Sequence, residues 1–328
     1  MTRTIRVAAV GECMLELSDP ATLPPALSFG GDTLNTAVYL ARLLPEAGQV
    51  DYLTALGDDP YSEAMLAAWR AEGIGTGLVA RLPGRLPGLY VIRTDAAGER
   101  SFYYWRSASA ARQMLEGEAG TRLCAALPDY GLIYLSGITL SILAPAARRR
   151  LLDAVDAARS AGSRVAFDIN YRPRGWRSVR AARVAMEAML QRADIALPGL
   201  EDLAALYGVG DIEAGADRVG ALGVGEICVK AGSGTCLLRH PAGEEHLPPL
   251  PDITAVDTTA AGDSFNAGYL AGRLCGQPPA AAAAAGHRLA AEVIQHRGAI
   301  IDRRAMPGDL VPAPAVEDAT AQRGNSDD

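Results

Sequence analysis

The sequence predicts an α/β protein in which a mainly parallel central sheet is covered by helices on both faces. Two observations support this prediction: short apolar runs recur along the chain, and amphipathic stretches of helical length separate them. Strands that alternate with helices in this way form doubly wound, largely parallel sheets. A third observation is an aromatic and β-branched segment at 88–106, which interrupts the alternation and predicts a separate small β-sheet.

The elements of the main sheet follow in order along the chain. Each apolar run is short and lacks the polar alternation of a half-exposed strand, so each is predicted to be a buried strand. These predicted strands lie at 5–11, 50–57, 132–137, 164–170, 194–198 and 226–232. The stretches between them have the Ala, Leu, Arg and Glu content of amphipathic helices. The predicted helices lie at 33–44, 61–73, 145–162, 178–192 and 214–222, with two more within 263–296.

The interrupting segment has two strand-forming runs around Asp95-Ala96-Ala97-Gly98, which is typical of a hairpin with a glycine turn. We expect it to stand outside the main sheet and to form a β lid from about residues 14–30 and 86–107. Side chains alternate between the two faces of a strand. We therefore expect Tyr104 and Arg106 to face a ligand, while Tyr103 and Trp105 pack on the other side.

Length and composition indicate one large domain. The chain has 328 residues, of which 1–310 are predicted to form the domain and 311–328 a disordered polar tail. The net charge of −7, without any basic block, argues against a nucleic acid or an anionic membrane as partner. Five scattered cysteines without a CxxC pair indicate reduced thiols, and the N-terminus resembles neither a signal peptide nor a membrane span. We expect a cytoplasmic protein.

The segment AVDTTAAGDSFNAGYLAG, at 255–272, places small residues directly before a helical pattern. A helix N-terminus has unpaired N–H groups and binds anions, and small residues let a phosphate approach the backbone. Gly262 is also able to adopt a positive φ in a tight turn. Asp263 could then accept a proton from an attacking hydroxyl while the amides hold a phosphoryl group. The alternative is that Asp263 is only a first-turn acid, which the helix dipole favours.

Two motifs together favour the catalytic interpretation. The string from Asp257 to Asp263, preceded in the chain by GGDTLNTAVYLARL at 30–43, resembles the ribokinase-like (PfkB) carbohydrate kinases. The resemblance implies a ribokinase-like fold with Asp263 as catalytic base. It also implies an anion hole formed by Ala260, Ala261 and Gly262.

The resemblance extends over about residues 5–310 and is closest to family members that phosphorylate a sugar acid. It implies ATP-dependent phosphorylation of 2-dehydro-3-deoxy-D-gluconate at its 6-hydroxyl, which gives 2-dehydro-3-deoxy-6-phosphogluconate and ADP. Arginine suits a carboxylate because it binds bidentately. The implied substrate residues, beside Asp263, are Gly31, Asn35, Tyr90, Tyr104, Arg106 and Arg172. Glu16 is a weaker candidate, and Arg172 could instead be a surface residue before Pro173.

The sequence carries fewer signals for the nucleotide site than for the substrate site. The resemblance implies that Lys230, Gly232, Gly234 and Gly262 bind ATP, although a plain hairpin also explains the two glycines of the turn. Mg²⁺ is expected with ATP because it neutralises phosphate charge. Its ligands stay open, since Gly199 and Asp202 replace the Asn and Glu of the family's Asn-x-x-Glu pattern. Dependence on a monovalent cation such as K⁺ is also open. Self-association through the lid, as a homo-oligomer, is a further expectation from the family.

One close alternative remains at this point, and the sequence argues against two others. Another kinase of the same family, of the fructokinase or ribokinase type, would share Asp263 but would not need Arg106 and Arg172. A nicotinamide-dependent dehydrogenase would need GxGxxG after the first strand, where the sequence has a single glycine, Gly11. A non-catalytic sugar-binding regulator would not need the base together with the anion hole.

Overall fold

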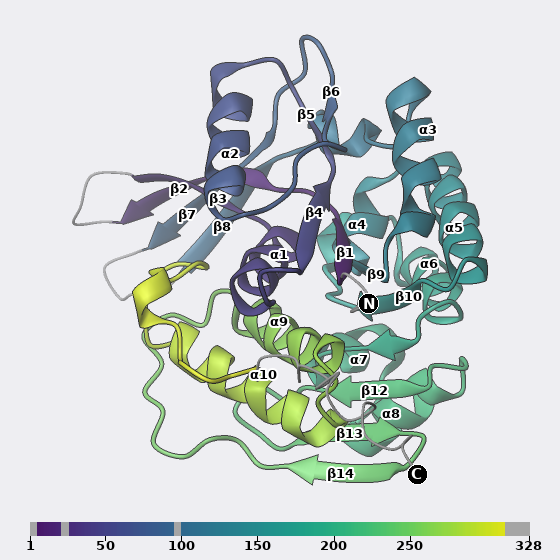
Figure 1. Cartoon of the computed structure of the whole chain (residues 1–328), viewed down its shortest axis with the longest axis vertical. Coiled ribbons are helices and arrows are strands. Elements are labelled where there is room, and N and C mark those ends of the chain that lie inside the picture. The colour runs from purple at the N-terminus through teal and green to yellow at the C-terminus, as the bar shows by residue number, and fades with distance from the viewer. Residues whose placement is uncertain (1–4, 21–25, 95–99, 312–328) are drawn as a thin grey trace, which may run out of the picture.

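The computed structural model describes residues 5–20, 26–94 and 100–311. Its largest element is an eight-stranded sheet with the strand order β14-β13-β12-β11-β10-β9-β1-β4 (Figure 1). Neighbouring strands from β4 to β12 are parallel, and β13 and β14 extend the sheet in antiparallel fashion. The strands are β1 (Arg6–Val10), β4 (Gln49–Leu53), β9 (Leu132–Ser136), β10 (Arg164–Asp168), β11 (Ile195–Ala196), β12 (Glu226–Val229), β13 (Cys236–His240) and β14 (Gly243–Leu247). The predicted fold class is confirmed.

Helices cover both faces of this sheet (Figure 1). One face carries α1 (Asp32–Leu43), α2 (Pro60–Ala71), α9 (Ala261–Leu274) and α10 (Pro279–Val293). The other face carries α3 (Gly117–Ala126), α4 (Gly137–Ile142), α5 (Pro145–Ser160), α6 (Val179–Leu190), α7 (Leu200–Tyr207) and α8 (Ile212–Gly220). Each face has its own apolar core, and β1 contributes Ala8 and Val10 to one core but Val7 and Ala9 to the other. This alternation follows from the period of two along a strand.

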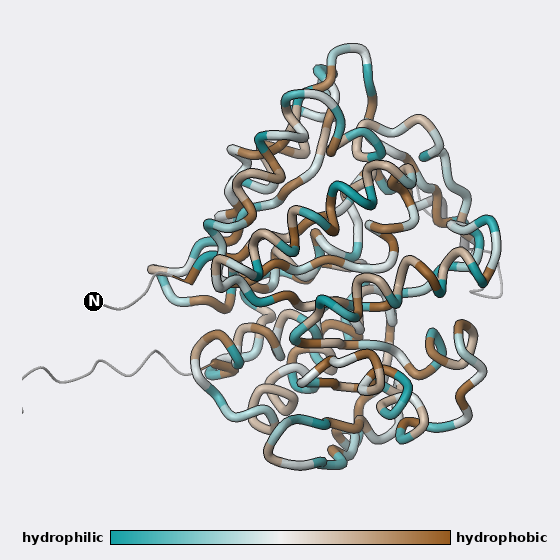
Figure 2. Tube along the Cα trace, turned by 90° about the vertical axis from the view of Figure 1, so that its right-hand side faces the viewer, coloured by the Kyte–Doolittle hydropathy of each residue, from teal (hydrophilic) through white to brown (hydrophobic). Residues whose placement is uncertain are grey.

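The helices are amphipathic, with hydrophilic and hydrophobic residues alternating along each trace (Figure 2). Several begin where the sequence supplies a capping side chain. Asp59 accepts hydrogen bonds from the first turn of α2, Ser178 caps α6, and Asp211 caps α8. Such caps satisfy backbone N–H groups that have no partner inside the helix.

A separate four-stranded sheet, called the small sheet below, has the order β3-β2-β7-β8. Its strands are β2 (Met14–Pro20), β3 (Ala26–Gly30), β7 (Gly88–Thr94) and β8 (Arg100–Trp105). It projects from one side of the main body (Figure 1). The antiparallel pairing of β7 with β8 confirms the predicted hairpin. The predicted turn at 95–98 and the predicted disordered tail, apart from Val311, lie outside the described residues.

The two faces of the small sheet differ in chemistry. The register sets Glu16 beside Tyr90 and Tyr90 beside Tyr104 on one face. The opposite face is mainly apolar, although Arg93 and Ser101 also lie on it. It carries Leu15, Leu17, Leu27, Phe29, Leu89, Val91, Tyr103 and Trp105. The expectation that Tyr103 and Trp105 pack is wrong within this chain, because they are 51% and 60% exposed.

The sequence differs from the structure in a few elements. The predicted strand at 50–57 divides at Thr54 into β4 and β5 (Ala55–Leu56), and β5 pairs with β6 (Ala80–Arg81) in a two-stranded sheet. Helices α3, α4 and α7 are not predicted, because α4 and α7 are short and α3 contains two glycines. Within the described residues, no helix is long and apolar enough to cross a membrane.

Candidate active site

The N-terminus of α9 is half-buried, and the residue that makes its turn differs from the one that the sequence suggests. Within the described chain the N-cap residue Ala260 makes no side-chain cap for α9, and the Ala261 N–H donates to the Thr258 carbonyl at 3.2 Å. A helix end without a side-chain cap is suited to binding an anion. The left-handed residue is Ala260, with φ 60°, and Gly262 is not among the positive-φ residues. Gly262 instead lies beside Lys230, whose Nζ would be 3.6 Å from a Cβ added at the glycine. A phosphate at this helix end would thus meet a lysine as well.

Asp263 lies in the first turn of α9 and is held by α1. Asn35 donates a hydrogen bond from Nδ2 to Asp263 Oδ2 at 2.8 Å, and Thr36 donates to the Asp263 backbone carbonyl at 3.1 Å. Burial and the charge of Asp32 raise the pKa of Asp263 to about 7, against the opposing hydrogen bond from Asn35. A carboxyl group with a pKa near the working pH is suited to general-base catalysis.

A buried polar network lies beneath this helix end. Lys230 Nζ donates to Asp168 Oδ2 at 3.1 Å and to Asn266 Oδ1 at 2.8 Å. Asn266 in turn donates to the same Asp168 oxygen at 2.7 Å. Asp168 ends β10, so the network stands at the carboxyl ends of the parallel strands, where open α/β sheets bind ligands. It fixes the ammonium group close to the N-terminus of α9.

The same strand end carries Arg172, one of the predicted substrate residues. Its Nη1 donates to Asp202 Oδ1 at 3.3 Å, while 59% of its side chain remains exposed. Burial and the charge of Asp168 raise the pKa of Asp202 to about 6. Two carboxyl groups that repel each other at a phosphate site are a suitable environment for Mg²⁺, although no three His, Cys, Asp or Glu groups of the described chain are arranged to hold a metal ion.

The face of the small sheet that carries Glu16 also carries two predicted residues. Tyr90 donates a short hydrogen bond to Glu16 Oε2, and its ring stacks on Tyr104 with centroids 5.9 Å apart.

The glycine pair Gly30-Gly31 is needed because a side chain would not fit at either position, and not because of the backbone conformation there. A Cβ at Gly30 would lie 2.2 Å from the Tyr90 hydroxyl oxygen, and one at Gly31 would lie 2.3 Å from the Glu12 carbonyl oxygen.

Arg106 forms a buried ion pair that joins the small sheet to the main sheet. It directly follows β8, and its Nη2 donates a short hydrogen bond to Glu12, which lies just after β1. The Glu12 side chain is fully buried, whereas 22% of the Arg106 side chain is exposed. Glu12 Oε1 and Arg106 Nε have no hydrogen-bond partner within the described chain. A substrate carboxylate could reach only the exposed part of the Arg106 side chain, because the unpartnered Nε is itself buried.

Sequence reasoning missed several residues of this site. The contacts join Asp263, Asn35 and Lys230 with Asp32, Asp168, Asn170 and Asn266, and they join Arg106 with Glu12. Their signal was available, because each lies within a segment that carries the family resemblance or at a strand end. The predicted Gly232 and Gly234 lie in the turn between β12 and β13, where Gly232 has φ 60°.

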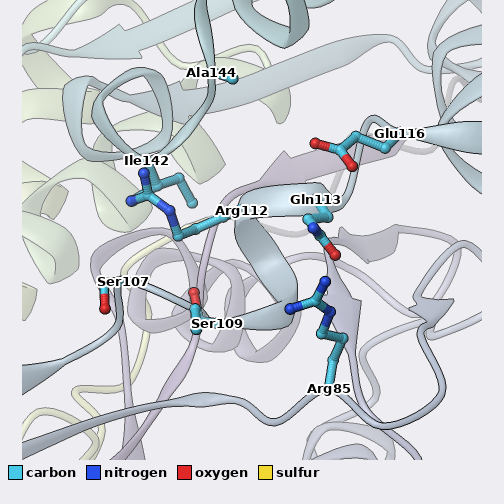
Figure 3. A pocket seen from close by; sticks show the side chains of 9 residues that line it. Arg85, Ser107, Ser109, Arg112, Gln113, Glu116, Ile142 and Ala144 are labelled. Carbon is cyan, nitrogen blue, oxygen red and sulfur yellow. The ribbon is translucent and has the colours of Figure 1, made fainter.

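A separate hollow of about 260 Å³ lies near the base of the small sheet (Figure 3). The predicted site residues, all within the described chain, do not line it. Its lining consists of Arg85, Ser107, Ala108, Ser109, Arg112, Gln113, Glu116, Ile142 and Ala144. The candidate site is therefore defined by the contacts above and not by this hollow.

Comparison with known proteins yields one family. The model of the pfkB family carbohydrate kinases matches residues 5–306. The 2-dehydro-3-deoxygluconokinase of Escherichia coli (strain K12) is 47% identical over 307 residues, which cover 92% of this chain and 99% of that protein. The protein of the same name from Dickeya dadantii (strain 3937) is 48% identical over 309 residues, covering 93% and 99%. The resemblance predicted from the sequence is confirmed.

Solved structures agree on the fold. The crystal structure of 2-dehydro-3-deoxygluconokinase from Thermotoga maritima has a TM-score of 0.78 at 21% identity, covering 91% of this chain and 95% of that one. The fructokinase with bound ATP from Xylella fastidiosa has a TM-score of 0.76 at 22% identity, covering 93% and 96%. At these identities the likeness concerns the fold alone.

Proposed function

Because the chain belongs to the pfkB family of carbohydrate kinases, we propose that it transfers the γ-phosphate of ATP to the 6-hydroxyl of 2-dehydro-3-deoxy-D-gluconate. The observation that carries the proposal is the meeting of Asp263, with a pKa raised to about 7, and the uncapped N-terminus of α9. The names and the high identity of the curated relatives support the choice of substrate. The products are 2-dehydro-3-deoxy-6-phosphogluconate and ADP.

Asp263 acts as the general base. Its carboxylate accepts the proton of the 6-hydroxyl as that oxygen attacks the γ-phosphorus, and Asn35 holds the carboxylate in place through its 2.8 Å hydrogen bond. The charge of Asp32 disfavours the ionised form of Asp263 and so makes it a better proton acceptor than an ordinary aspartate.

The anion hole stabilises the charge of the transferring group. The amides at Ala260, Ala261 and Gly262 lie at the positive end of the α9 dipole, and Lys230 adds a full positive charge beside Gly262. Asp202 is the carboxylate that would hold Mg²⁺, since both oxygens of Asp168 already accept hydrogen bonds from Lys230, Asn266 and the Asn170 N–H. Such an ion neutralises the phosphate oxygens when ATP is bound.

The two arginines provide specificity for an acid. Arg106 and Arg172 each have exposed guanidinium surface and unused donors, so either one can bind the carboxylate of the sugar acid. Tyr90 and Tyr104 supply the face of the small sheet, which closes over the sugar and excludes water. Gly31 and Asn35 bring backbone and amide groups to the same place.

We also propose that residues 1–310 form one kinase domain, with the small sheet as its lid. We propose further that the protein is a homo-oligomer. Support for the oligomer comes from the exposed Tyr103 and Trp105 on the outer face of the small sheet. A second copy would cover this face.

The proposal is tested by measuring ADP release with Mg-ATP and a panel of acceptors. We expect turnover with 2-dehydro-3-deoxy-D-gluconate to exceed that with fructose, ribose or adenosine by several orders of magnitude in kcat/KM. Preference for a neutral sugar would retain Asp263 as base but contradict the roles of Arg106 and Arg172. Lack of turnover with all four would contradict the kinase assignment.

A further inference from the structure

Two cysteines meet beside the proposed nucleotide site. Cys228 in β12 and Cys236 in β13 are both buried, and their sulfur atoms are 3.0 Å apart. The strands are antiparallel, with Cys228 paired to Leu238 and Val229 to Leu237. Continuing this register by one residue sets Cys236 opposite Lys230. The two thiols therefore flank the residue whose Nζ lies beside the N-terminus of α9.

The two thiols differ in chemistry. The hydrogen bond from Cys228 lowers the pKa of Cys236, and the nearby His287 and Lys230 lower it further against the effect of burial. Burial raises the pKa of Cys228, which makes it the donor of the pair. Thiolates, not thiols, react with oxidants. Cys236 is thus the nucleophile and Cys228 lies in contact with it as the resolving thiol.

We propose that Cys228 and Cys236 form a site of reversible oxidative modification, at which a hydroperoxide closes a disulfide that weakens ATP binding. The Cys236 thiolate attacks the terminal peroxide oxygen, the O–O bond breaks, and a sulfenic acid forms together with an alkoxide, or with hydroxide when the oxidant is hydrogen peroxide; this anion takes a proton. The Cys228 sulfur then attacks the sulfenic sulfur and forms the S–S bond, and the hydroxyl group leaves as water with the thiol proton. In total, two thiols and one hydroperoxide give one disulfide, one water and one molecule of the corresponding alcohol or water.

The other cysteines lack these features. Burial raises the pKa of Cys13, Cys124 and Cys275, and among the described contacts none of them meets a second thiol. The turn between the paired cysteines includes Gly232 and Ser233, which are exposed. The proposal requires this turn to open far enough to admit a small oxidant, since both cysteines are buried.

The expected effect of the disulfide on ATP binding depends on Lys230 and therefore rests on the proposed function. A disulfide requires the sulfur atoms to approach from 3.0 Å to about 2.05 Å, so β12 and β13 must shift against each other. Lys230 directly follows β12, and its backbone is bonded to the segment that leads into α7: its N–H donates to the Pro198 carbonyl, and its carbonyl accepts from the Leu200 N–H. A shift at its backbone moves Nζ away from Asp168 and Asn266, and so from the anion hole.

The chemical step is tested on the folded full-length protein. Reduced protein is treated with hydrogen peroxide, and free thiols are counted before and after by titration and peptide mapping. We expect loss of two of the five free thiols, linkage of Cys228 to Cys236, and full reversal by dithiothreitol. Cys228→Ser and Cys236→Ser should prevent the linkage, whereas the matched control Cys275→Ser should behave as the unmodified sequence does. A different linkage, or none without denaturant, would overturn the proposal.

The coupling is tested by binding rather than by turnover. Calorimetric titration with a non-hydrolysable ATP analogue should give a Kd at least ten-fold higher for the oxidised protein than for the reduced protein. The Cys236→Ser variant should show the same Kd before and after peroxide. Equal affinity of the oxidised and reduced forms would overturn the coupling to Lys230. If the reduced protein does not bind the analogue at all, the failure lies in the proposed function and not in the disulfide.

Discussion

At the N-terminus of α9, burial and the charge of Asp32 both disfavour the ionised form of Asp263, and its pKa rises to about 7. Asn35 and Lys230 act in the opposite direction, while Asp168 adds to the repulsion. Since the base must be deprotonated to accept a proton, activity should be lost as the pH falls through this pKa. An ordinary aspartate would lose activity only near pH 4.

Replacing Asp32 tests this account of the base. Asp32→Asn removes one negative charge beside Asp263, so the pKa of Asp263 should fall and the acidic limb of kcat/KM should move to lower pH. The measurement is the pH profile of kcat/KM for the sugar acid. Asp153→Asn, an exposed change on α5, is the matched control and should leave the limb in place. If the acidic limb of kcat/KM lies at the same pH in Asp32→Asn as in the unmodified protein, the electrostatic account is contradicted.

At the residue scale, the sequence proposed Asp263 and Asn35 through the resemblance of two motifs, and the structure joins these two residues by a 2.8 Å hydrogen bond. It did not single out Asp168, Asn266 or Glu12, although each lies in a segment that carries the resemblance or at a strand end. Their roles depend on contacts between segments about a hundred residues apart, such as the 2.7 Å hydrogen bond from Asn266 to Asp168. It noted that Gly262 is able to adopt a positive φ, whereas Ala260 is the residue that does so, because propensity favours glycine there but does not dictate it.

At the element scale, the ion pair between Glu12 and Arg106 joins the small sheet to β1. Arg106→Met leaves the fully buried Glu12 without a counter-charge, so we expect a loss of about 3–5 kcal/mol in the free energy of unfolding. Glu12→Gln should cost less, because Arg106 is partly exposed and can be solvated. Denaturant unfolding of both variants makes the comparison. Equal losses, or a neutral Arg106→Met, would show that the pair does not anchor the small sheet.

The elements themselves were largely predictable. Periodicity identified the strands and long helices of the main sheet, since buried strands are continuous apolar runs. The hairpin of β7 and β8 was evident from its aromatic residues. The parallel pairing of β2 with β7 was not, because it joins segments about seventy residues apart and leaves no local signal. Short helices such as α4 were not predicted, because they have too few residues to show a hydrophobic period.

At the scale of the whole molecule, the outer face of the small sheet is the feature that the chain alone does not explain. Leu27, Tyr103 and Trp105 are each at least 51% exposed and lie on one apolar face. We expect the protein to have a mass in solution above its chain mass of 34.3 kDa, and Trp105→Asp to lower it towards that value.

Light scattering after gel filtration provides the measurement for this prediction. The matched control is Val184→Asp on α6, where the side chain is 64% exposed but lies away from the small sheet. It should leave the mass unchanged. A monomeric unmodified protein, or an unchanged mass in Trp105→Asp, would mean that the apolar face does not mediate association.

The central claim is that Asp263 removes the proton of the attacking hydroxyl, and Asp263→Asn tests it most directly. Turnover of the sugar acid with Mg-ATP and calorimetric binding of both substrates are measured on the same preparation. We predict that kcat falls by about 100- to 10,000-fold while both affinities stay near their original values. Turnover within a few fold of the unmodified protein would contradict the assignment of Asp263 as the base.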